Sequence, residues 1–166
     1  MISCDSYFKK CRHDGFTICA IAPQKGWIGI EPEDYSFSLY HYVVRGSAKI
    51  GVPFKEGYQI VKPKQFFDFK DYLHESVMME ALEDFYMIGF STMDKEQDWD
   101  GRLVTEEILK LSSDSYVICF DGQPTINDQV FTRFDYAEVS SKKEYEISLN
   151  DGVLALFTKK INTIII

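Results

Sequence analysis

Apolar and polar residues alternate with a period of two along much of the chain, the pattern of β-strands that bury one face. The clearest such stretch runs from Ser36 to Val44. One of its faces carries Phe37, Leu39, His41 and Val43, and the other carries Ser36, Ser38, Tyr40 and Tyr42. The turn residues Arg45-Gly46-Ser47 follow, so we predict that the chain reverses direction there.

Other short apolar runs end at glycine, proline or acidic residues and predict further strands. They cover 16–22, 26–30, 48–52, 59–61, 66–69, 77–81, 85–90, 116–120, 131–139, 145–149 and 153–158. Residues 76–84 have a helix-like composition, but we favour the strand, and 105–111 fits a helical turn or a strand. The acidic stretch 94–100 is the best linker candidate. The apolar end, 161–166, is expected to pair as a strand within the fold or across a homodimer.

Two segments of the chain resemble each other. Leu, Asp and Phe recur at a constant offset of 67 residues between 82–91 and 149–158. Upstream, the glycine turn at Gly46 matches the one at Gly122. A duplication is therefore one explanation, and chance similarity between hairpins is the other. We expect a single compact body over 1–166, with pseudo-repeats at 16–92 and 99–160.

The segment 40–50, Tyr-His-Tyr-Val-Val-Arg-Gly-Ser-Ala-Lys-Ile, resembles the first motif of the cupin superfamily. The later stretch from Pro63 to Phe90 resembles the second part of the cupin pattern, an aromatic strand followed by an apolar hairpin. The resemblance implies a mainly all-β fold, a cupin-like double-stranded β-helix or jelly-roll barrel. Two copies would make a bicupin, and the compact metal-free bicupins of the HutD/Ves type are the nearest architectural analogue.

Metal-binding cupins carry a His-x-His pair and a Glu about seven residues before the turn glycine. In this chain Leu39 stands at that distance from Gly46, and Ser115 from Gly122. The three histidines, His13, His41 and His74, are not neighbours in the sequence. Cys4, Cys11 and His13 lie close together, but their spacing fits no common zinc pattern. We therefore expect no metal and no cofactor.

Composition and charge exclude several classes of protein. The net charge of −8 argues against a nucleic-acid backbone as a partner. The chain has no apolar run long enough to span a membrane and no run typical of a signal peptide, so a cytoplasmic location is expected. The four cysteines fit free cytosolic thiols. Aromatic residues make up 15% of the chain and supply material for a core.

Three residues are candidates for ligand binding, namely His41, Tyr42 and Trp99. In a jelly roll the face with His41 would line the interior, where the imidazole could act as a base or orient a ligand. The alternative, which we favour, is a buried histidine with a structural role. Trp99 could stack on a sugar, although packing at a seam between two lobes is the more common role.

Three functions fit these observations. The first is a non-enzymatic, metal-free binding or interaction module for a small polar ligand or a protein partner, acting as a homo-oligomer. The second is a metal-independent epimerase or isomerase of a sugar derivative, with His41 as the base. The third, suggested only by composition and β content, is a viral structural or host-interaction protein. We favour the first, a role without catalysis.

Overall fold

A computed structural model describes residues 7–13, 15–31, 38–52, 56–68, 76–92 and 99–160. Every regular element in these ranges is a β-strand, which confirms the all-β prediction. Among the same residues, none forms a helix that could cross a membrane. The chain divides into two compact units, residues 1–94 and 95–166, called lobe 1 and lobe 2 below.

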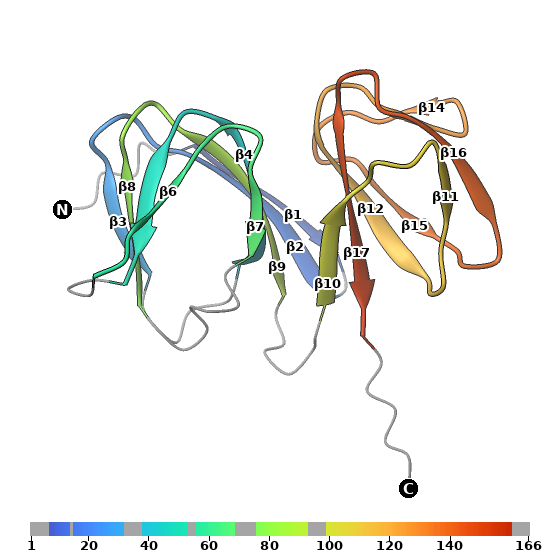
Figure 1. Cartoon of the computed structure of the whole chain (residues 1–166), viewed down its shortest axis with the longest axis horizontal. Helices are drawn as coiled ribbons and strands as arrows, with labels where there is room; N and C mark the ends of the chain where they lie inside the picture. Colours follow the sequence, from blue (N-terminus) through green and yellow to red (C-terminus); the bar gives the residue numbers. More distant parts are fainter. Residues whose placement is uncertain are drawn as a thin grey trace, which may run out of the picture. The chain divides into compact units, whose positions relative to one another are not determined.

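Lobe 1 contains two antiparallel sheets (Figure 1). The larger has the order β1-β2-β9-β4-β7 and the smaller the order β3-β8-β5-β6. The bounds are β1 Tyr7–His13, β2 Phe16–Ala22, β3 Ile28–Glu31, β4 Ser38–Arg45, β5 Ala48–Gly51, β6 Gln59–Val61, β7 Phe66–Asp68, β8 Val77–Ala81 and β9 Tyr86–Thr92.

Lobe 2 repeats this arrangement with two four-stranded sheets. Their orders are β10-β17-β12-β15 and β11-β16-β13-β14. The bounds are β10 Trp99–Leu103, β11 Ile108–Lys110, β12 Ser115–Asp121, β13 Thr125–Ile126, β14 Gln129–Val130, β15 Tyr136–Val139, β16 Glu144–Ser148 and β17 Val153–Lys159. Apart from the added β1, each lobe therefore has the same strand order, and each is a jelly roll.

The turn that precedes the edge strand β7 in lobe 1 has the same conformation as the turn that precedes the edge strand β15 in lobe 2. In lobe 1, Lys64 has a φ of 70° and donates its backbone N–H to the carbonyl of Val43. In lobe 2, Phe134 has a φ of 77° and donates to the carbonyl of Cys119. A side chain closes both turns, because Gln65 accepts from the N–H of Lys62 and Asp135 accepts from that of Thr132. The likeness between the lobes therefore extends to single hydrogen bonds.

Glycine turns mark the point where the chain passes from the larger sheet to the smaller one. Gly46 lies between β4 and β5 with a φ of 78°, and a Cβ there would overlap the carbonyl oxygen of Asp84 in the β8–β9 turn. Gly122 has a φ of 72°, and a Cβ there would overlap the backbone of Gly152. Only glycine combines this φ with so close an approach of two backbones.

Each lobe has its own apolar core between its two sheets. The core of lobe 1 contains Val43, Ala48, Ile50, Val61, Ala81, Phe85 and Met87. The core of lobe 2 contains Val104, Leu109, Val117, Cys119, Ile126, Phe131, Val139, Ile147, Leu154 and Leu156. The opposite face of each larger sheet is also buried and rich in aromatic pairs. They include Phe16–Phe90 and Tyr40–Phe66 in lobe 1, and Trp99–Tyr116 and Phe120–Phe157 in lobe 2.

The structure corrects several predicted boundaries. The linker predicted at 94–100 is too long, because Trp99 and Asp100 begin β10 and pair with β17. The strand predicted at 131–139 begins only at Tyr136, since residues 132–135 form the turn described above. Strands β1, β10, β13 and β14 were not predicted, and the open choice at 105–111 resolves as the strand β11. The predicted strand at 161–166 lies outside the described residues.

The predicted pseudo-repeats, 16–92 and 99–160, coincide with the ranges that share a strand order. Their origin by duplication stays a prediction, as does the packing of both into a single body.

Replacing Gly46 by Ala should destabilise the protein by at least about 2 kcal/mol, because the new Cβ meets both an unfavourable φ and a backbone carbonyl. Gly26→Ala is the matched control, since Gly26 also has a positive φ, of 88°, but has nothing within 4 Å of the added Cβ. Urea unfolding of both variants measures the difference. Equal losses would mean that the close approach at Gly46 contributes nothing.

Candidate binding site in the interior of lobe 1

Strand β4 lies inside its sheet between β9 and β7, and its residues 40–43 are all buried. Val43 belongs to the core of lobe 1. Because side chains alternate along a strand, His41 shares the interior face with Val43. The structure thus places His41 where the sequence predicted it, and its side chain is only 2% exposed.

One row of residues crosses the larger sheet of lobe 1 at the level of His41. His41 pairs with Gly89 on β9 and with Phe67 on β7, and Gly89 pairs in turn with Cys19 on β2. The rings of His41 and Phe67 stack with their centroids 5.2 Å apart. The row therefore reads Cys19–Gly89–His41–Phe67, and all four positions face the interior.

Polar groups gather around this row. The thiol of Cys19 donates to the carbonyl oxygen of Gly89 at 3.6 Å and lies 3.7 Å from the hydroxyl of Ser91. Gly89 has no side chain, so the backbone of β9 faces the interior between Cys19 and His41. Glycine within a strand is typical of places where a ligand or another backbone comes close.

Lobe 2 has a different row at the equivalent position. Val117 pairs with Leu156 and Ala137, and Leu156 pairs with Arg102. The row reads Arg102–Leu156–Val117–Ala137, with an apolar pair where lobe 1 has His41 and Gly89. Val117 and Leu156 both belong to the core of lobe 2. At this level the two central strands of lobe 2 thus carry an apolar pair, where those of lobe 1 carry His41 and Gly89.

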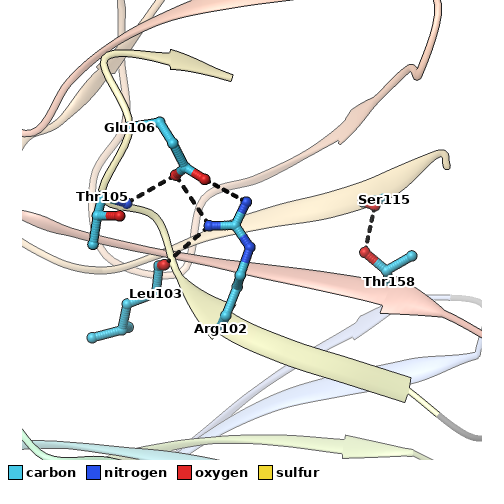
Figure 2. A network of polar contacts seen from close by, with 6 residues as sticks. All are labelled: Arg102, Leu103, Thr105, Glu106, Ser115 and Thr158. Carbon is cyan, nitrogen blue, oxygen red and sulfur yellow. Dashed lines mark hydrogen bonds and ion pairs between the residues drawn. The ribbon is translucent and has the colours of Figure 1, made fainter. Parts of the chain in front are cut away.

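The polar groups near this row in lobe 2 bind one another, as Figure 2 shows. Arg102 forms an ion pair with Glu106 at 2.7 Å and donates to the carbonyl of Leu103. This contact holds the pKa of the Glu106 carboxyl below its usual value. The hydroxyls of Ser115 and Thr158 lie 2.7 Å apart within hydrogen-bonding distance. These contacts are local and pair the polar groups of lobe 2 with one another.

Burial decides the charge of His41. Desolvation disfavours the imidazolium and lowers the pKa of His41 to about 3. The ring is therefore neutral near pH 7, and one ring nitrogen is a donor while the other is an acceptor. A base of such low pKa takes protons poorly at neutral pH, so the environment of His41 suits hydrogen bonding better than proton abstraction.

The other two predicted site residues lie on a different face and in a different lobe. Tyr42 follows His41 on β4 and lies on the opposite face of the sheet, where it is 4% exposed. Trp99 begins β10 in lobe 2, is buried, and packs on Tyr116 with ring centroids 6.2 Å apart. Within lobe 1, His41 and Tyr42 thus do not share a face. Ligand binding by Tyr42 or Trp99 and the seam role of Trp99 stay predictions.

No group of three or more His, Cys, Asp or Glu residues that could hold a metal ion occurs within the described ranges. Cys4 and His74 lie outside those ranges. Cys11 and His13 belong to β1, but their side chains are not among those described. Cys119 is a buried free thiol whose pKa is raised to about 11, mainly by desolvation.

A second feature, which the sequence analysis missed, is the outer face of the smaller sheet of lobe 1. It contains Ile28, Ile30, Lys49, Tyr58, Ile60, Met78 and Glu80, and we call it the outer face below. The isoleucines are 52–57% exposed and Tyr58 is 39% exposed. The signal was present as two isoleucines flanking Gly29. These residues fall in the predicted strand 26–30, but the sequence does not show which face of that strand lies inward.

The titration of His41 should make the protein less stable in acid. Its folded-state pKa lies below the unfolded value of about 6.5, so the unfolded chain binds the extra proton and stability falls as pH drops below 6.5. Relative to His41→Val, the wild type should lose about 2 kcal/mol of unfolding free energy between pH 7.5 and pH 5. Urea unfolding across this range provides the measurement. A wild-type-to-variant difference that does not vary with pH would refute the neutral, buried imidazole.

No model of a protein family matches the sequence, and no curated protein matches it. Solved structures do match over nearly the whole chain. A cupin 2 conserved barrel domain protein from Leptotrichia buccalis is 9% identical, with a TM-score of 0.53, and 93% of this chain and 88% of that one are covered. HutD from Pseudomonas fluorescens SBW25 is 14% identical, with a TM-score of 0.61 and 95% of each chain covered.

A conserved protein of unknown function from Pseudomonas aeruginosa PAO1 is 10% identical, with a TM-score of 0.64, and 94% of this chain and 90% of that one are covered. Identities this low bear on the fold alone. Together with the strand orders of both lobes, they identify the fold: the chain has the cupin fold, in two jelly-roll lobes with a bicupin-like architecture.

Proposed function

We propose that this protein is a metal-free, non-enzymatic binding module and that the interior of lobe 1 receives a small polar ligand. The observation that carries the proposal is the difference between the two rows. Lobe 1 has Cys19, Gly89 and His41 where lobe 2, with the same strand order, has Arg102, Leu156 and Val117. Because the same framework folds with the apolar pair Leu156 and Val117 at the positions of Gly89 and His41, the fold itself does not require a glycine and a histidine there.

The chemistry of the row supports a small ligand that can both accept and donate hydrogen bonds. A neutral imidazole at His41 presents one donor and one acceptor. The hydroxyl of Ser91 can do both, and a glycine within a strand is the residue type at which a ligand can come close to the backbone. Phe67 stacks on His41 and restricts the orientation of its ring. These features select for shape and hydrogen bonding, with no cationic side chain in the row.

The epimerase hypothesis receives less support. General-base catalysis is most effective when the pKa of the base lies near the working pH, and that of His41 lies near 3. The described residues also place no carboxylate in the row with His41, whereas that hypothesis needs a partner for the base. The third hypothesis, a viral structural or host-interaction protein, stays a hypothesis that rests on composition.

The proposal predicts that a larger side chain at Gly89, in the row of His41, will abolish ligand binding. A thermal-shift screen with monosaccharides, short carboxylates and small amides should include a compound that stabilises the wild type. At about one hundred times its Kd such a compound adds about 2.7 kcal/mol to the free energy of unfolding. Gly89→Leu introduces the side chain that lobe 2 carries at this position and should remove the shift, and the milder Gly89→Ala should weaken it.

Leu156→Met is the matched control, because it changes the equivalent position of lobe 2 at nearly constant volume and should leave the shift intact. Circular dichroism checks that each variant is folded. The proposal fails if no compound in the screen stabilises the wild type, or if the same compounds stabilise Gly89→Ala and the wild type equally.

A further inference from the structure

The outer face of lobe 1 is an apolar surface with two charges at its centre. Its strands lie in the order β3-β8-β5-β6, so β3 and β6 form the margins. Ile28 and Ile30 lie on β3, and Ile60 and Tyr58 lie on β6 or just before it. Lys49 on β5 and Glu80 on β8 pair directly between them. Exposed isoleucines in this arrangement are unusual for a solvated sheet face, which is normally polar.

The equivalent face of lobe 2 also exposes Ile108 and Val130, but it carries a charged pair where lobe 1 has an apolar one. In lobe 2, Ile108 pairs with Glu146, and in lobe 1, Ile28 pairs with Glu80. We use these two Ile–Glu pairs to align the outer faces of the two lobes position by position. Two residues further along, lobe 1 pairs Ile30 with Met78. At the matching position lobe 2 pairs Lys110 with Glu144, whose charged atoms lie 3.9 Å apart. The apolar pair in lobe 1 is therefore not a requirement of the fold.

The two central charges of the outer face do not neutralise each other. The ammonium of Lys49 lies over the ring of Tyr58, 4.1 Å from its centroid, on the side away from β8. Tyr58 in turn covers Gly51, where a Cβ would come within 2.7 Å of its ring. Among the residues that the structure describes, Glu80 forms no ion pair. The centre of the face thus offers one cation and one anion on adjacent strands.

We propose that the outer face binds the outer face of a second copy of this chain and forms a symmetric dimer. A two-fold axis parallel to the strands and between β8 and β5 places β5 of one copy over β8 of the other. Lys49 then meets the partner's Glu80, and the pair occurs twice. The same axis places Ile28 over the partner's Ile60 and Ile30 over the partner's Tyr58.

The face is therefore complementary to itself in both charge and apolarity, and this selects a second copy as the occupant. Four strands about 4.8 Å apart make a small interface, so we expect a weak dimer with a Kd in the micromolar range. This proposal is independent of the ligand site, because the outer face and the row of His41 lie on different sheets of lobe 1.

Sedimentation equilibrium of the full chain from about 1 to 200 μM tests the dimer. The wild type should approach twice the chain mass of 19.2 kDa as its concentration rises. The double variant Ile30→Lys, Met78→Glu gives lobe 1 the ion pair of lobe 2 and should weaken the dimer by at least about 30-fold. Because lobe 2 tolerates that pair at the same position, this variant is expected to fold.

Charge reversal tests the predicted geometry. Lys49→Glu or Glu80→Lys alone places like charges opposite each other and should also weaken the dimer, whereas the two together should restore it. The exchange Lys110→Glu, Glu144→Lys in lobe 2 is the control and should change nothing. The proposal is wrong if the wild type stays at the monomer mass, or if the Ile30→Lys, Met78→Glu variant dimerises as well as the wild type. If each single charge reversal weakens the dimer but the double reversal does not restore it, Lys49 does not pair with Glu80 of the partner subunit.

Discussion

The contact between two backbone turns at one end of each lobe fixes the rest of the structure. At Gly46 the chain leaves the larger sheet for the smaller, and at residues 82–85 it returns. The two crossings touch so closely that a side chain at Gly46 would overlap a carbonyl oxygen, and the carbonyl of Ser47 accepts the N–H of Leu82. A third crossing joins them, because the N–H of Phe85 donates to Pro23. The junction therefore ties the two sheets of lobe 1 together where the chain crosses between them.

The same constraint explains which parts of the fold could be predicted. Gly46, Gly122 and the Asn150-Asp151-Gly152 turn need conformations that few residues adopt, so the sequence marks them clearly. The strands between them alternate in polarity and were found. The short strands β13 and β14 were missed because Asn127 and Asp128 form their turn without a glycine, at φ values of 48° and 62°. Strand β10 was missed because its charged residues resemble a linker.

The candidate site was predictable only in part. Alternation along β4 placed His41 inside, yet it also put Tyr42 on the opposite face, so that these two could not share a site. The partners of His41 in its row come from β2, β7 and β9, which are distant in sequence. Their alignment depends on sheet register, which a single sequence does not reveal. The outer face was missed for the same reason, since its isoleucines look like core residues until the inward side of each strand is known.

Two lobes with one strand order provide an internal comparison that a single barrel lacks. The features they share, such as the glycine crossings and the turns at Lys64 and Phe134, are those that the fold requires. The positions where they differ are free of that requirement, and two such differences concern the row of His41 and the outer face of lobe 1. The row of His41 carries polar groups on the interior face, where a core is expected. The outer face carries apolar side chains where contact with water is expected. These two departures are the places from which the proposals of a small ligand and of a second copy start.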